Sequence, residues 1–274
     1  MGEALAERLS LAGHKVYGLR RTVPGNTPYT PLQGDVSDAQ SLHAIPEALD
    51  GLVYCVGAGA QDEAAYKAAY YSGLKNVLHV INQQATPPKR IIFVSSSGVY
   101  HQQDGSIVDE SSLAEATRPA TRWLLTAEAL LYASPLPGCV VRFSGIYGPD
   151  RTRIIDQVRD GTAVCTLPDN HILNHIHRDD CAGVLEHLLN LPEPDALYLG
   201  TDCEPVTRNT CYRWIAERCA LPEPPEQEAL TTAGPTRGGN RRYSNQRLLD
   251  SGYTFLYPTY CEGYAAHLTP ESNS

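Results

Sequence analysis

The sequence lacks a long apolar run. Within its 274 residues, no stretch approaches the roughly 18 consecutive apolar residues that a membrane-spanning helix needs. The first residues, from Met1 to Arg8, carry acids where a signal peptide has a basic start followed by an apolar stretch. We therefore expect a cytoplasmic protein that has no membrane partner.

The sequence also lacks paired cysteines and a surplus of basic residues. None of its eight cysteines forms a C-x-x-C pair, so we expect no metal and no compact disulfide framework. The formal net charge of −9 argues against a nucleic-acid partner, because binding to a phosphate backbone needs a clustered basic surface. No internal repeat is present.

What the sequence does contain is an alternation of strand-like and helical segments. Short apolar runs such as 51–57 and 90–95 predict strands that are buried on both faces of a parallel sheet. The alternation predicts a doubly wound Rossmann-type α/β fold, with ligands at the carboxyl ends of the strands. The expected elements are strands over 14–19, 33–36, 51–57, 90–95 and 139–143, and helices over 5–12, from about Asp38, over 64–82 and over 122–133.

After Pro149 the pattern becomes looser. We expect a dinucleotide-binding domain over residues 1–149 and a smaller, closely packed α/β lobe on the substrate side over residues 150–274. The final segment, from Thr269 to Ser274, is expected to be a disordered tail. The lobe's expected elements are helices over 151–160, 179–190 and 210–219 and strands over 163–167 and 196–199.

Several motifs follow one another along almost the whole chain. They are Gly2-x-x-Leu5-Ala6-x-x-Leu9-x-x-x-Gly13, Ser95-Ser96-Ser97-Gly98-Val99-Tyr100, Arg142-Phe143-Ser144-Gly145-Ile146-Tyr147-Gly148-Pro149, Ile176-His177-Arg178-Asp179-Asp180, Arg241-Arg242-Tyr243-Ser244-Asn245 and Tyr257-Pro258-Thr259-Tyr260. In this order and spacing, the chain resembles the extended short-chain dehydrogenase/reductase superfamily, especially its atypical NAD(P)-dependent epimerase/dehydratase-like branch.

The resemblance implies that the phosphate-binding loop of the cofactor site is incomplete. Gly2 would be its third glycine, which permits close packing of helix against sheet. The first strand and the first two glycines have no counterpart, so we expect exposed edges on both strands that would flank that strand. Between a start codon assigned too late and a naturally shortened protein, we favour the former.

The end of the second strand bears on the choice of cofactor. An NAD-selective site places an acid there, whereas Arg20 and Arg21 favour NADP, whose 2′-phosphate suits guanidinium groups. The alternatives are a solvated surface pair and binding of NAD. The other positions that the resemblance places beside the cofactor are Asp35 and Val36, at the adenine, and Val56, Gly57 and Ala58, at a strand exit.

The catalytic centre of the superfamily uses a tyrosine, a lysine and a serine. Ser96 matches the serine, which hydrogen-bonds the reacting oxygen; the alternative is a polar strand-end residue satisfied by the backbone. Ala120 stands at the tyrosine position and Leu124 at the lysine position. The hydroxyl of the neighbouring Thr121 is far too weak an acid to replace a phenol. The usual carbonyl/alcohol chemistry is therefore not expected.

Other side chains offer suitable chemistry with weaker support. Tyr100 and Tyr147 carry phenols near the expected cleft, but each belongs to a turn that recurs for structural reasons. His175 and His177 would share one face of a strand. We favour a structural role over metal binding for both histidines, with Asp179 as a helix N-cap.

Two further features concern partners. Arg241 or Arg242 could contact an anionic substrate such as a nucleotide diphosphate, with no more than one of the two entering a cleft. The superfamily commonly forms homodimers through the helices that follow the fourth and fifth strands. The apolar residues of those helices, which could equally belong to the core, are Tyr66, Tyr70, Leu74, Trp123, Leu124 and Leu130.

Three hypotheses for the function follow. The first is an NADP-binding reductase- or epimerase-like protein that acts on a small or nucleotide-linked substrate by an altered mechanism. The second is a non-catalytic sensor or regulatory module that binds a dinucleotide and another protein, which the absence of both tyrosine and lysine favours. The third is a form that binds no cofactor stably.

Overall fold

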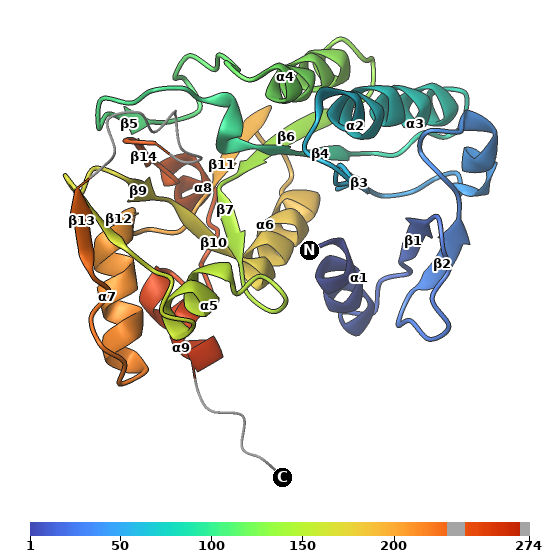
Figure 1. The fold of residues 1–274 in the computed structure, drawn as a ribbon. Coiled ribbons are helices and arrows are strands. Elements are labelled where there is room, and N and C mark those ends of the chain that lie inside the picture. The colour runs from blue at the N-terminus through green and yellow to red at the C-terminus, as the bar shows by residue number, and fades with distance from the viewer. Residues whose placement is uncertain (229–238, 269–274) are drawn as a thin grey trace. The chain divides into compact units, whose positions relative to one another are not determined.

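The computed structural model describes residues 1–228 and 239–268 (Figure 1). The described chain divides into two units of interleaved segments. Unit 1 contains residues 1–101, 113–142 and 182–198, and unit 2 contains residues 102–112, 143–181 and 199–274. The expected tail over 269–274 lies outside the described residues. Of the described helices, none combines the length and the apolar character needed to cross a membrane.

The main sheet has four strands in the order β11-β6-β4-β3. Its strands form because uninterrupted apolar runs can be buried on both faces: Ile91, Ile92 and Phe93 in β4 are all fully buried. The strands are β3 (Leu52–Tyr54), β4 (Ile91–Ser96), β6 (Gly138–Phe143) and β11 (Leu197–Gly200). Together with the helices between them, this parallel sheet confirms the expected doubly wound α/β fold.

A second, two-stranded sheet precedes the main one along the chain. Its strands β1 (Tyr17–Arg20) and β2 (Thr30–Gln33) pair in parallel, with Tyr17 opposite Thr30. Within the described residues, β1 pairs only with β2 and β3 pairs only with β4. In the described chain, each of these two strands therefore pairs along one edge only, as expected.

The helices of unit 1 depart in detail from the expected ones. The segment from Asp38 forms a 3₁₀ helix, η1 (Ala39–Ala44), with the Asp38 carboxylate accepting the N–H of Gln40. The helix expected over 64–82 contains one π-helical turn. The elements are α1 (Gly2–Leu11), α2 (Glu63–Tyr66), the π turn η2 (Lys67–Ser72), α3 (Gly73–Asn82), the 3₁₀ turn η3 (Ser97–Val99), α4 (Pro119–Tyr132) and α6 (Arg178–Asn190).

Arg90 fixes the end of α6 within unit 1. Its guanidinium donates to the carbonyl oxygens of Leu188, Leu189 and Pro192, at 2.7, 3.0 and 2.9 Å, and also to that of Leu191. A helix leaves its last carbonyl groups without partners, and a cation is favoured there. Arg90, which directly precedes β4, thus satisfies carbonyl groups at the end of a helix about a hundred residues later.

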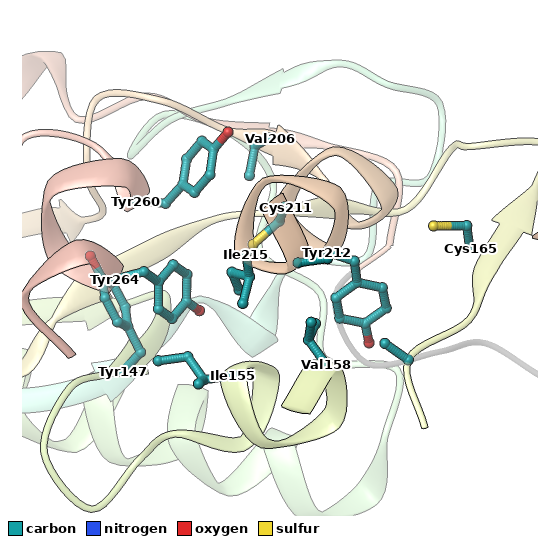
Figure 2. Packing of buried hydrophobic residues seen from close by; sticks show 12 residues of the cluster. Tyr147, Ile155, Val158, Cys165, Val206, Cys211, Tyr212, Ile215, Tyr260 and Tyr264 are labelled. Carbon is teal, nitrogen blue, oxygen red and sulfur yellow. The ribbon is translucent and has the colours of Figure 1, made fainter. Parts of the chain in front are cut away.

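In its described residues, unit 2 contains short paired strands, four helices and an apolar cluster. In this cluster, shown in Figure 2, Ile155 and Val158 of α5 pack against Ile215 of α7 and Tyr264 of α9. The helices are α5 (Arg153–Arg159), α7 (Arg208–Arg218), α8 (Gln246–Asp250) and α9 (Tyr260–Leu268). The strand pairs are β5 (Ile107–Val108) with β14 (Arg242–Tyr243), β7 (Gly145–Tyr147) with β10 (His175–His177), β8 (Cys165–Leu167) with β13 (Glu226–Glu228) and β9 (Ile172–Leu173) with β12 (Val206–Thr207).

Candidate cofactor and active site

Gly2 lies where helix α1 meets the end of β3. A Cβ atom on Gly2 would come within 2.8 Å of the Cys55 sulfur, which is closer than side-chain carbons approach other atoms. Glycine is therefore needed for this close approach of helix and sheet, the role expected for the third glycine of a dinucleotide-binding loop. Val56, Gly57 and Ala58 follow directly, so this part of the predicted cofactor site is brought together in unit 1.

Arg20 and Arg21 lie at the carboxyl end of β1. The Arg20 guanidinium donates to the Glu3 carboxylate in the first turn of α1, at 3.2 Å. Arg21 is exposed. The N-terminus of α1 carries unpaired backbone N–H groups and a partial positive charge. The Arg20 guanidinium therefore lies close to a helix end that favours anions, and Arg21 is the next residue along the chain.

Asp35 and Val36 follow β2 and are held by different contacts. The Asp35 carboxylate accepts hydrogen bonds from the backbone and side chain of Ser37, at 2.9 and 2.8 Å. These hydrogen bonds lower the pKa of Asp35 despite the opposing effect of burial, and the charge of Arg21 adds a smaller lowering. The Val36 carbonyl accepts from the Asn76 amide at 2.8 Å, which anchors this turn to α3.

Ser96 is the last residue of β4 and lies at its carboxyl end. Its side chain is half-buried, and its Oγ accepts the backbone N–H of Gly98 at 3.1 Å, which starts the 3₁₀ turn η3. The hydrogen bond to the backbone that the alternative interpretation expects for Ser96 is therefore present. Because a hydroxyl both accepts and donates, the Ser96 proton remains able to bond a substrate oxygen.

A buried polar network involves residues on either side of Ser96 in the chain. Sequence reasoning did not assign this network a role. The Arg142 guanidinium donates to the Glu128 carboxylate at 3.0 and 2.5 Å and to the Tyr100 hydroxyl at 2.7 Å. The Ser95 hydroxyl donates to Glu128 at 2.6 Å. Burial opposes the charge of Arg142, but the hydrogen bonds and charge of Glu128 outweigh it and raise the pKa of Arg142. The only signal in the sequence was the position of Glu128 on the inner face of a helix.

The tyrosine and lysine positions of the superfamily fall on the first turns of α4. Ala120 is half-buried and offers only a methyl group. Leu124 is 2% exposed and belongs to the apolar core. The Thr121 hydroxyl is also buried and donates to the Arg118 carbonyl at 2.9 Å. No side chain at these three positions can act as an acid or base.

Tyr147, His175 and His177 form an aromatic cluster in the interior of unit 2. The Tyr147 ring lies 5.5 Å from His175 and 5.3 Å from His177, both edge-on. Its hydroxyl is buried, packs against Gly263 and has no hydrogen-bond partner within the described residues. Burial lowers the pKa of each histidine to about 4.

His177 also caps helix α6. Its Nδ1 accepts the backbone N–H of Asp179 at 3.1 Å, and its Nε2 lies 2.8 Å from Nε2 of His267. Asp179 itself lies in the first turn of α6, which begins at Arg178, so its prediction as the N-cap was wrong. Over residues 1–228 and 239–268, no group of three or more side chains is arranged to hold a metal ion.

Arg241 and Arg242 point in different directions in unit 2. Arg241 is 5% exposed and donates to the Tyr243 hydroxyl at 2.7 Å and to the Gln102 carbonyl at 3.0 Å. Arg242 is exposed and donates to the Gly105 carbonyl at 3.0 Å. One side chain of the pair therefore enters the interior of the unit, and the other faces solvent.

Comparisons with known proteins give one family match and many structural matches. The model of the NAD-dependent epimerase/dehydratase family matches residues 1–196. A structure from Methylobacillus flagellatus assigned to the NAD-dependent epimerases/dehydratases is 36% identical, covering 96% of this chain and 92% of that one with a TM-score of 0.78. A search of curated proteins finds no match.

Two further structures show the range of similarity. A conserved protein of unknown function from Silicibacter pomeroyi is 26% identical, with 96% of this chain and 93% of that one covered and a TM-score of 0.74. The human epimerase family protein SDR39U1, solved with NADPH, is 20% identical, with 93% and 91% covered and a TM-score of 0.73. The similarity to the human protein is one of fold.

Proposed function

The chain belongs to the NAD-dependent epimerase/dehydratase family, and from this premise we propose that it binds NADP as an extended short-chain dehydrogenase-type reductase- or epimerase-like protein. The observation that carries the proposal is the position of Arg20 beside the first turn of α1, with Arg21 following it at the end of β1. A helix N-terminus and guanidinium groups both favour phosphate. The NADPH in the human structure supports a nicotinamide dinucleotide as the cofactor.

The proposed cofactor site is built from the ends of three strands in unit 1. Gly2 allows α1 to approach the end of β3. Asp35 and Val36 would hold the adenine side of the dinucleotide, and residues 56–58 would lie along it. When bound, the dinucleotide supplies hydride transfer. Ser96 hydrogen-bonds the reacting oxygen of a small or nucleotide-linked substrate, and Ala120 and Leu124 leave the acid/base role to another group.

Binding and turnover can be tested separately. Titration of the chain with NADPH, followed by tryptophan and NADPH fluorescence, should show saturable binding. NADPH oxidation is then screened with carbonyl compounds and sugar nucleotides. Ser96→Ala should lower turnover by roughly a hundredfold without weakening NADPH binding. Ser134→Ala, a matched change in the loop after α4, is the control. Turnover that Ser96→Ala leaves unchanged would remove Ser96 from the mechanism.

A second candidate is a non-catalytic dinucleotide sensor that binds another protein. The observation that favours it is the burial of Leu124 in the core, because the packing there excludes the charged amine of the superfamily's lysine. Tight NADPH binding with no turnover on any carbonyl or sugar-nucleotide substrate would favour this candidate. Turnover that depends on Ser96 would exclude it.

A further inference from the structure

A carboxylate lies beside the arginine that would bind the 2′-phosphate in the proposed cofactor site. Glu3 directly follows Gly2, in the first turn of α1, and its Oε2 lies 3.2 Å from the Arg20 guanidinium. Both side chains reach solvent, with 52% of Glu3 and 40% of Arg20 exposed. The arginine at the end of β1 is therefore already engaged by an acid of the neighbouring helix.

Two other charged residues, Asp35 and Arg21, belong to the same proposed site. The Asp35 carboxylate accepts two hydrogen bonds from Ser37 of its own turn, and the charge of Arg21 contributes to its lowered pKa. Arg21 is exposed and forms no ion pair within the described part of the chain. Of the two guanidinium groups, only that of Arg20 forms an ion pair in the described part of the chain, and its partner is the exposed Glu3 carboxylate.

The Glu3–Arg20 pair affects NADP and NAD unequally. An exposed ion pair contributes little to stability, so a phosphate group can displace it. The 2′-phosphate of NADP, however, carries the same sign of charge as Glu3 and needs the same guanidinium. The ribose hydroxyls of NAD are neutral and can donate hydrogen bonds to a carboxylate.

We propose that Glu3 is a specificity-determining residue, whose carboxylate competes with the 2′-phosphate of NADP for Arg20. The competition lowers the preference for NADP that Arg20 and Arg21 would give alone, and lets NAD bind as well. This inference rests on the proposed function, because it concerns the same dinucleotide site.

The test compares the chain with its Glu3→Gln and Glu3→Ala variants. Calorimetric titration measures the affinity for NADP⁺, for NAD⁺ and for 2′,5′-ADP, a probe that carries the 2′-phosphate without the nicotinamide. Both variants should bind NADP⁺ and 2′,5′-ADP about threefold to tenfold more tightly, with NAD⁺ affinity changed less than about twofold. The gain should shrink in about 1 M salt, which screens exposed charges.

Glu7→Gln is the matched control. Glu7 is an exposed acid one turn later in α1, so the variant changes net charge equally without touching Arg20. The inference is overturned if Glu3→Gln leaves the ratio of NADP⁺ to NAD⁺ affinity as it was, or if Glu7→Gln changes that ratio equally. If the unmodified chain and all variants bind none of the three ligands, the proposed function fails and the inference fails with it.

Discussion

Arg142 donates hydrogen bonds to both carboxylate oxygens of Glu128 inside unit 1, where the two side chains are only 7% and 3% exposed. The pair links β6 to α4, and through Tyr100 and Ser95 it reaches both sides of Ser96. It thus fixes the turn that presents the proposed substrate-binding hydroxyl.

Removing one member of this pair should strongly destabilise the fold. Glu128→Leu leaves the Arg142 charge buried and unpaired, so we expect the free energy of unfolding to fall by about 3 to 5 kcal/mol in a urea titration. The double change Glu128→Leu with Arg142→Met removes both charges and should recover part of this loss. Asp50→Asn, which breaks an exposed pair with Lys89, should change the free energy of unfolding far less, because exposed pairs contribute little to stability. Similar losses for Glu128→Leu and Asp50→Asn would contradict the assignment.

Restoring the superfamily's lysine should destabilise the protein. Leu124→Lys places an ammonium group at a position that is 2% exposed, and we expect the free energy of unfolding to fall by roughly 2 to 5 kcal/mol. Ala129→Lys, at an exposed position of the same helix, is the control and should change stability little. Equal melting temperatures for the two variants would show that this part of α4 tolerates an amine.

The two candidate tyrosines should respond differently to loss of the hydroxyl group. Tyr147→Phe removes a buried hydroxyl that has no partner within the described residues, so stability should stay constant or rise. Tyr100→Phe removes the acceptor of an Arg142 hydrogen bond and should cost about 1 to 3 kcal/mol. Thermal unfolding measures both. A large loss for Tyr147→Phe would mean that its hydroxyl has a bonding role.

The fold could be predicted where the signal is local. The apolar run around Phe93 can only be accommodated by a buried strand, and the left-handed backbone of Gly13, with φ of 87°, ends the first helical segment as expected. The π-helical turn η2 could not be foreseen. The carbonyl of Ala69 in that turn accepts the hydroxyl of Tyr54, a residue on a distant strand.

In the candidate site too, residues in local motifs could be predicted from the sequence, whereas contacts between elements could not. Gly2 and Ser96 were predicted because each belongs to a short motif next to a helix or strand end. The Glu3–Arg20 and Glu128–Arg142 pairs join residues 17 and 14 positions apart, on different elements. No periodicity or motif encodes such a contact, because it depends on how helices pack against strands.

The buried histidines of unit 2 should make stability depend on pH. His175 is 3% exposed, and burial lowers its pKa to about 4, below that of an unfolded histidine. The unfolded chain therefore binds more protons in this range, so His175 supports the fold above about pH 6.5 and loses this effect toward pH 4. Its share of the free energy of unfolding should fall by about 2 kcal/mol from about pH 7 to about pH 5. Urea titrations at both pH values should show a smaller fall for His175→Gln than for the unmodified chain, and an unchanged fall for His14→Gln, an exposed control. The same fall in His175→Gln as in the unmodified chain would assign the pH dependence to other groups.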